Sequence, residues 1–345
     1  MPPDDVIRLR MTVRGIVLLW SLLIGLPGFG QQQQPGVDDA NSHAAQARRD
    51  TRQSSSPTAT EEAPAKSGIP VPDLTPGPDG KLTQDQMQKL LRVVADKDLE
   101  NDKRQRNYTY IEREVNSKLD GNGKTKSTEV RTYEILEIYG EQVQKLIAKD
   151  DKPLSAKEAA KEDEKIQKII DKRKNESEAD RRKREEKERK DREEERAFVR
   201  DVADAYNFKL VGADVVAGRN AWVIDGEPRP GFQPHMKDAK YLPKFHGRVW
   251  IDTGDLQLAR MDVECLDTIS WGAFLVRFHK GSRLVLEQTR VNDEVWLPRQ
   301  LGVKVDVRLA LLKNFHVDVE QTFRDYKKFR TETKIVGIGE LQEPK

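Results

Sequence analysis

The chain has few residues with which to build covalent or metal-linked stability. Its single cysteine, Cys265, excludes an intramolecular disulfide, and the 345 residues contain no CxxC motif or Cys/His cluster for a structural zinc site. Aromatic residues make up 6% of the chain, and hydrophobic residues, at 36%, barely outnumber charged residues, at 35%. We therefore expect one packed domain together with long polar segments.

An excess of charge of one sign is also missing. The 61 basic and 59 acidic residues leave a formal net charge of +2. Nucleic-acid-binding domains carry a concentrated positive field, which this mixture does not provide, so we expect no nucleic-acid partner.

Motifs that carry catalytic chemistry are absent as well. The sequence contains no GxSxG, Walker A or GxGxxG motif, and His235 and His246 lack the HExxH spacing of a helical zinc site. His316, Asp318 and Glu320 share one face of a predicted strand, as metal ligands or, as the alternation favours, as its solvent face. We predict a protein that is not an enzyme and has no cofactor and no metal.

The N-terminus has the three parts of a secretory signal. Three arginines precede an apolar run from Gly15 to Leu26, and small residues follow up to Gly30. The run is shorter than the roughly 20 residues of a membrane-spanning helix, so residues 1–30 predict a signal peptide cleaved near Gly30, with an uncleaved anchor as the alternative. Either Met1 or Met11 can start this signal. No cysteine near the cleavage point can carry a lipid.

Two segments differ sharply in composition after the signal. Residues 31–80 are rich in Gln, Pro and Ser and predict a disordered tether. Residues 81–340 predict a β-rich domain, which begins at a capping box of Thr83 and Gln86 that opens a helix to about Leu99.

A charged helical insertion is predicted at about 155–206. It begins at a second capping box, Ser155 with Glu158, and between residues 171 and 196 almost nothing is apolar. Acidic and basic residues four apart support a solvated helix there. This helix is either an arm that contacts a partner or a projecting helix without a binding role.

Most of the remaining chain alternates apolar and polar residues with the period of a β-strand. Short turns such as DTGD and HKGS join these segments, so neighbouring strands should pair antiparallel in a curved sheet. Cys265 continues this alternation as a buried, unreactive thiol. A longer Pro-rich connection, residues 226–247, is either functional or a lid.

A sheet with one apolar face needs a cover, and the amphipathic helices are the available elements. If their side chains fill the space, the domain has an inert core; if not, a cavity for acyl chains remains. Tryptophans 222, 250, 271 and 296 either line such a cavity or cap the core edges through their indole N–H groups. The ligand-cavity candidates are the apolar residues of one strand face: Val249, Ile251, Phe274, Val276, Phe278, Leu284, Leu286, Val303, Val305, Val307, Phe315 and Val317.

The order of helix, hairpin, helix and then strands with the phrases GRVWID, LARMDVE and VWLPRQ resembles the outer-membrane lipoprotein-sorting superfamily, with its LolA-like, LolB-like and sigma-E regulator-like members. The resemblance covers roughly residues 83–338. It implies an α+β fold, an unclosed antiparallel β-barrel covered by helices, here with a long charged projecting helix added.

The resemblance also implies a function in the periplasm. The first expectation is a binding protein that holds a lipid or a lipoprotein acyl chain between sheet and helices, with peripheral membrane contact. The alternative is a non-carrier envelope interaction or stress-sensing module that binds a protein partner through the charged helix. The ligand and the oligomeric state stay open.

Overall fold

The structure is a computed structural model that describes residues 82–139, 141–271, 276–309 and 313–329, together with Asp73 and Thr75. The predicted signal peptide, the tether apart from those two positions, and Phe274 lie outside the described residues.

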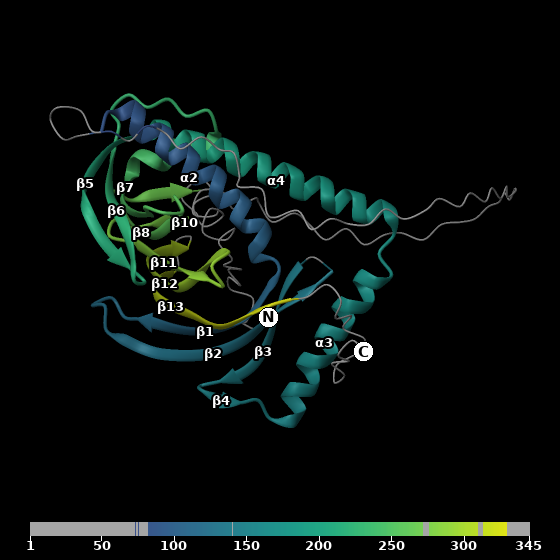
Figure 1. Ribbon diagram of the computed structural model, residues 1–345. Coiled ribbons are helices and arrows are strands. Elements are labelled where there is room, and N and C mark those ends of the chain that lie inside the picture. Colours follow the sequence, from purple (N-terminus) through teal and green to yellow (C-terminus); the bar gives the residue numbers. More distant parts are fainter. Residues whose placement is uncertain are drawn as a thin grey trace, which may run out of the picture.

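Thirteen described strands form one antiparallel sheet (Figure 1). They are β1 (Tyr108–Leu119), β2 (Thr125–Ile138), β3 (Glu141–Lys149), β4 (Lys152–Pro153), β5 (Tyr206–Val216), β6 (Arg219–Pro228), β7 (Phe245–Asp252), β8 (Leu258–Cys265), β9 (Ile269–Trp271), β10 (Val276–Phe278), β11 (Arg283–Val291), β12 (Val295–Leu309) and β13 (Lys313–Lys328). The main path runs β4-β3-β2-β1-β13-β12-β11-β8-β7-β6-β5, and β9 and β10 attach beside β12.

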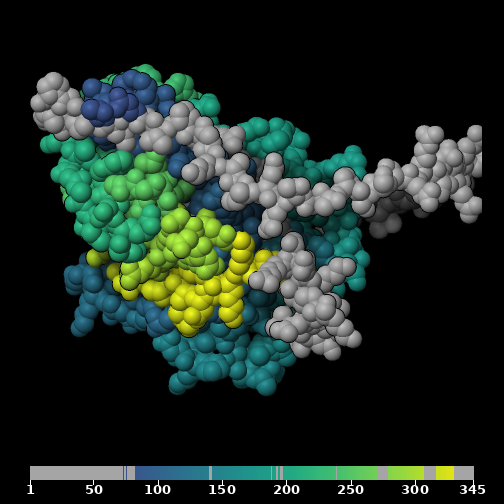
Figure 2. Space-filling view, viewed as in Figure 1, coloured from purple at the N-terminus to yellow at the C-terminus, as the bar shows by residue number. Residues whose placement is uncertain are grey.

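The two ends of this path, β4 and β5, do not pair, so the sheet stays open as predicted. The first described strand lies beside the last, which Figure 2 shows as blue surface against yellow. This pairing of β1 with β13 joins the N-terminal hairpin to the C-terminal meander in one curved surface.

The helices are α2 (Gln84–Gln105), α3 (Ala156–Lys174), α4 (Glu178–Ala205) and the 3₁₀ helix η2 (Lys237–Lys244). Helices α2 and α4 run side by side across the β5–β8 part of the sheet, and α3 packs beside β3 (Figure 1). Both predicted capping boxes are present, at Thr83 with Gln86 and at Ser155 with Glu158.

Two expectations about these elements are corrected. Helix α2 continues past Leu99 to Gln105, since its last turns are anchored to β12 as described below. The charged segment is two helices, because Ser177 caps a new helix by accepting a hydrogen bond from the backbone N–H of Asp180. Glu176 holds the corner with ion pairs to Arg173 and Arg184, each at 3.1 Å.

Candidate functional site: the concave face of the sheet

The half of the concave face formed by β5–β8 is filled by helix side chains. Met87 and Leu90 of α2 are fully buried against Ile224 and Ile251 of the sheet, in a cluster that also includes side chains of α4 and η2. The candidate residue Ile251 therefore contacts helix side chains, and Val249 packs at the edge of the same cluster. Here the helices and sheet form a close-packed core.

Two amide side chains fix α2 to the sheet at both of its ends. Gln84 donates to the carbonyl oxygen of Phe208 (2.6 Å) and accepts from its N–H (3.0 Å). Asn101 does the same at Trp296, at 2.7 and 2.8 Å. The helix is thereby held across the sheet from β5 to the start of β12.

The other half of the concave face, from β11 to β2, is apolar without a contribution from the described helices. Its buried members are Tyr110, Ile135, Leu284, Leu286, Leu301, Val303 and Phe323. Leu258 packs against this cluster and against the helix-covered one, so the two apolar surfaces are continuous. We call this second cluster the β11–β2 face.

Several of the sequence-predicted cavity residues meet on the β11–β2 face. Leu284 and Leu286 lie opposite Val303 and Leu301 across β11 and β12, and Val305 lies opposite Val317 across β12 and β13. For Val276, Phe278, Val307 and Phe315 only the backbone is described, with Val307 between Phe278 and Phe315 in the ladder.

A buried polar group that the sequence interpretation missed borders the β11–β2 face. Glu112, Glu114 and Asn116 alternate along β1, and Gln321 of β13 lies directly opposite Glu114. The Gln321 amide donates to Glu112 (2.9 Å) and to Glu114 (3.1 Å), while Gln144 donates to Glu112 at 3.5 Å. We call Glu112, Glu114, Asn116 and Gln321 the β1–β13 polar cluster.

Burial perturbs both carboxyl groups of this cluster. It raises the pKa of Glu112 to about 8, with a further rise from the charge of Glu114 and an opposing effect of the Gln144 hydrogen bond. Burial also raises the pKa of Glu114, against the hydrogen bond from Gln321. Only 1% of Glu112 is exposed, so its ionised form is costly at neutral pH.

The alternation in YIEREVN was the signal for this cluster. It places Glu112, Glu114 and Asn116 on one strand face, but only the pairing of β1 with β13 shows that this face is the concave one.

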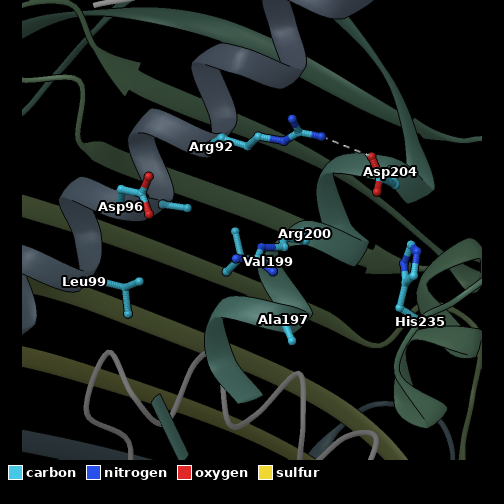
Figure 3. A pocket seen from close by; sticks show the side chains of 9 residues that line it. Arg92, Asp96, Leu99, Ala197, Val199, Arg200, Asp204 and His235 are labelled. Carbon is cyan, nitrogen blue, oxygen red and sulfur yellow. Dashed lines mark ion pairs between the residues drawn. The ribbon is translucent and has the colours of Figure 1, made fainter. Parts of the chain in front are cut away.

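A groove of about 630 Å³ lies between α2 and α4 on the outer side of the helices (Figure 3). Arg92 and Asp204 face each other across it at 3.7 Å, and Leu99 and Ala197 form part of its apolar wall. The buried carboxylate of Asp201 accepts hydrogen bonds from the backbone N–H groups of His235 and Met236, which holds the Pro-rich connection against α4. The connection is thus anchored near the groove.

Two tryptophans take the capping role rather than the cavity role. The Trp250 indole donates to Asp214 at 3.0 Å, and the Trp296 indole donates to Asp255 at 2.9 Å. Both belong to a cluster with Val216, Ala221, Val223 and Ala259, apart from the β11–β2 face.

The other predicted single residues have ordinary partners. Cys265 is buried as predicted, burial raises the pKa of its thiol, and its Sγ–H donates to the Asp267 carbonyl. His316 lies 3.1 Å from Asp306, its cross-strand neighbour. Within the described ranges there is no group of three His, Cys, Asp or Glu side chains suited to a metal ion, and no helix there is long and apolar enough to cross a membrane.

Comparisons with known proteins give a likeness of fold. No family model and no curated protein matches the chain. Similar solved structures include a putative outer membrane lipoprotein-sorting protein domain from Vibrio parahaemolyticus, with 11% identity, 71% of this chain and 95% of that chain covered, and a TM-score of 0.30. A LolA superfamily protein from Nitrosomonas europaea has 7% identity, coverages of 70% and 93%, and a TM-score of 0.23.

The Pseudomonas aeruginosa MucA/MucB complex also resembles the chain, with 10% identity, coverages of 69% and 100%, and a TM-score of 0.18. At such identities and TM-scores these likenesses carry no argument about a ligand or a partner, so function has to be argued from the chain's own geometry.

Proposed function

We propose that the chain is an exported periplasmic protein that binds an apolar ligand, a lipid or a lipoprotein acyl chain, on the β11–β2 face. The observation that carries the proposal is the composition of that face: a continuous apolar surface to which no described helix contributes a side chain. Its continuity with the helix-covered core gives a ligand a rigid wall on one side.

The physical gain is sufficient for such a ligand. Burying an acyl chain contributes about 0.8 kcal/mol for each methylene removed from water. Leu284, Leu286 and Val303 provide the aliphatic contacts for this burial. The export signal predicted for residues 1–30 supports the proposal, because such signals are typical of proteins that leave the cytoplasm.

Native mass spectrometry of the full chain, purified from a bacterial periplasm, tests the proposal. We expect a bound species of lipid mass that is released on denaturation and identified by solvent extraction. A folded protein that carries nothing and takes up neither an added phospholipid nor an added long-chain alkylammonium would rule the proposal out.

A second candidate function is supported by the groove between α2 and α4. This groove and the exposed charges of α4, such as Arg189 with its neighbours Glu186 and Glu193, form a surface suited to a protein partner. The proposal here is an envelope interaction or stress-sensing module.

Crosslinking discriminates this candidate from the first. A photoreactive residue at position 189 should give protein adducts, whereas the same residue at Lys126, exposed on the β1–β2 hairpin, serves as the matched control. With the photoreactive residue kept at position 189, the double variant Glu186→Ala with Glu193→Ala should reduce the adducts without removing bound lipid. Lipid adducts alone, or equal adducts at both positions, would contradict the partner role of α4.

A further inference from the structure

Two buried oxygen atoms of the β1–β13 polar cluster have no hydrogen-bond partner among the described residues. Gln321 donates through its Nε2 to Glu112 and Glu114, but its buried Oε1 has no hydrogen-bond partner. The Oδ1 atom of Asn116, on the same strand face, is also buried without a partner. Gln321 is only 1% exposed, so water does not readily satisfy it.

Unpartnered buried acceptors are costly, typically as much as a lost hydrogen bond each, and they are therefore a reason to expect a ligand. Gln288, which alternates with Leu284 and Leu286 along β11, is fully buried and has no partner for either amide atom. Buried polar atoms without a hydrogen-bond partner therefore lie on both sides of the apolar part of the concave face.

Among the described residues no cation forms an ion pair with Glu112 or Glu114, although the charge of Arg131 lowers the pKa of Glu114. Arg131 lies opposite Glu114, but its guanidinium pairs with Glu129. Tyr133 lies opposite Glu112 and contributes no positive charge. On this face of β1 and β2 the carboxyl groups of Glu112, Glu114 and Glu129 therefore outnumber the cations, which are Arg131 and the exposed Lys118.

We infer that the β1–β13 polar cluster binds the primary ammonium group of an amphiphile whose acyl chain lies on the β11–β2 face. This inference rests on the proposed function and names the chemical class of the ligand's polar end. A primary ammonium has three N–H donors and no acceptor, which matches the carboxylates and the free oxygen of Gln321.

The register places the two parts of such a ligand next to each other. Gln321 lies opposite Glu114 on one side and opposite Leu301 on the other, and Leu301 lies opposite Leu286. The apolar surface therefore begins one strand away from the carboxylates. A head group at Gln321 directs its chain over Leu301 and Leu286.

The same chemistry excludes other head groups. A carboxylate would be repelled by Glu114, and a trimethylammonium group has charge but no N–H to donate. Binding of an ammonium should also ionise Glu112, whose pKa is raised to about 8, and release its proton near pH 7.

Calorimetry of the full chain with three amphiphiles of equal chain length tests the inference. The probes are dodecylammonium, dodecyltrimethylammonium and dodecanoate, each below its micelle concentration. We expect dodecylammonium to bind at least about tenfold more tightly than the other two, as charge-assisted hydrogen bonds predict. Its titration in two buffers of different ionisation enthalpy should reveal proton release.

Glu112→Gln should reduce the affinity for dodecylammonium about tenfold, abolish the proton release, and leave dodecanoate binding equal or tighter. Glu134→Gln is the matched control, because Glu134 lies opposite Ile111 on the other face of β2 and should not affect the preference. Circular dichroism confirms that both variants are folded.

Two negative results are distinguishable. Equal binding of all three probes, or an unchanged preference in Glu112→Gln, overturns the ammonium site and leaves the proposed function standing. Binding of none of the probes by folded protein overturns both.

Discussion

The two halves of the concave face differ in what meets their apolar side chains. On β5–β8, Ile224 and Ile251 are fully buried against α2 and the helices beside it. On the β11–β2 face, Leu286 and Leu301 are equally buried, but the described helices supply no side chain to their cluster. The first half is a core in the ordinary sense, and the second has the composition of a ligand wall.

The halves also differ in polar content. Helix α2 is attached to the sheet through polar groups that are satisfied. The Gln84 amide pairs with the backbone of Phe208, and the Asn101 amide pairs with the backbone of Trp296. The half from β11 to β2 buries Glu112 and Gln321 with acceptors left over. Among the described residues, single buried atoms of Gln257 and Arg260 in the β7–β8 part also have no partner, but only at the β1–β13 polar cluster do the unpartnered acceptors lie beside buried carboxyl groups.

The largest effect is expected from truncating a side chain that is buried between α2 and the β5–β8 part of the sheet. Leu90→Ala should lower the free energy of unfolding by about 2–5 kcal/mol, because it opens a cavity under α2. Chemical denaturation measures this. Leu286→Ala in the other half should lose a similar amount with ligand present, but less when the protein is stripped of ligand. An identical loss in both states would contradict the distinction between the halves.

The buried carboxyl of Glu112 should make stability depend on pH. Its folded pKa, raised to about 8, lies above the unfolded value, so the folded state binds the proton more strongly and stability falls as pH rises from about 4.5 to 8. Glu112→Gln should remove this fall and stabilise the ligand-free protein at pH 8 by on the order of 3 kcal/mol. Denaturation curves from pH 5 to 8.5 measure it, and Glu134→Gln should retain the wild-type slope.

Removing the C-terminal anchor of α2 should have an intermediate effect. Asn101→Ala leaves the N–H of Trp296 without its amide partner, while the Trp296 carbonyl keeps the hydrogen bond from Gln105, and the change should cost about 1–3 kcal/mol. Hydrogen exchange should accelerate in residues 95–105 and leave the N-terminal turns of α2 protected. Uniform acceleration along α2 would show that the helix docks as one unit.

The exposed charges of α4 should contribute least. Arg189 pairs with Glu186 and Glu193 but is about half exposed, so Arg189→Ala should change the free energy of unfolding by at most about 0.5 kcal/mol. Thermal denaturation at low and high salt checks this. A loss above 1 kcal/mol would mean that the charged part of α4 around Arg189 is packed and not solvated.

Much of the fold is predictable because its signals are local. The Thr83 and Ser155 capping boxes fix two helix starts, and the alternation around Val303 and Val305 fixes a strand face. The break at Ser177 also has a local signal, since Asp180 follows at capping distance, but the charged residues on both sides hide it. Strand β3 has mixed polar and apolar residues, and its pairing with β2 defines it more clearly than its pattern does.

The candidate site is only partly predictable because it depends on pairings between distant parts of the chain. Leu284, Leu286, Val303 and Val305 follow from alternation alone. That Glu114 meets Gln321, and that Ile251 is covered by α2, follows only from the sheet order and the helix docking.

Methyl NMR with a paramagnetic ligand tests the central claim most directly. A long-chain alkylammonium with a nitroxide on its alkyl chain is titrated into the full chain with labelled Ile, Leu and Val methyl groups. The account predicts broadening at Leu284, Leu301 and Val303, with sharp signals at Leu90, Ile224 and Ile251. Broadening of the second group, or of neither group when the protein is folded, would contradict a ligand site on the β11–β2 face.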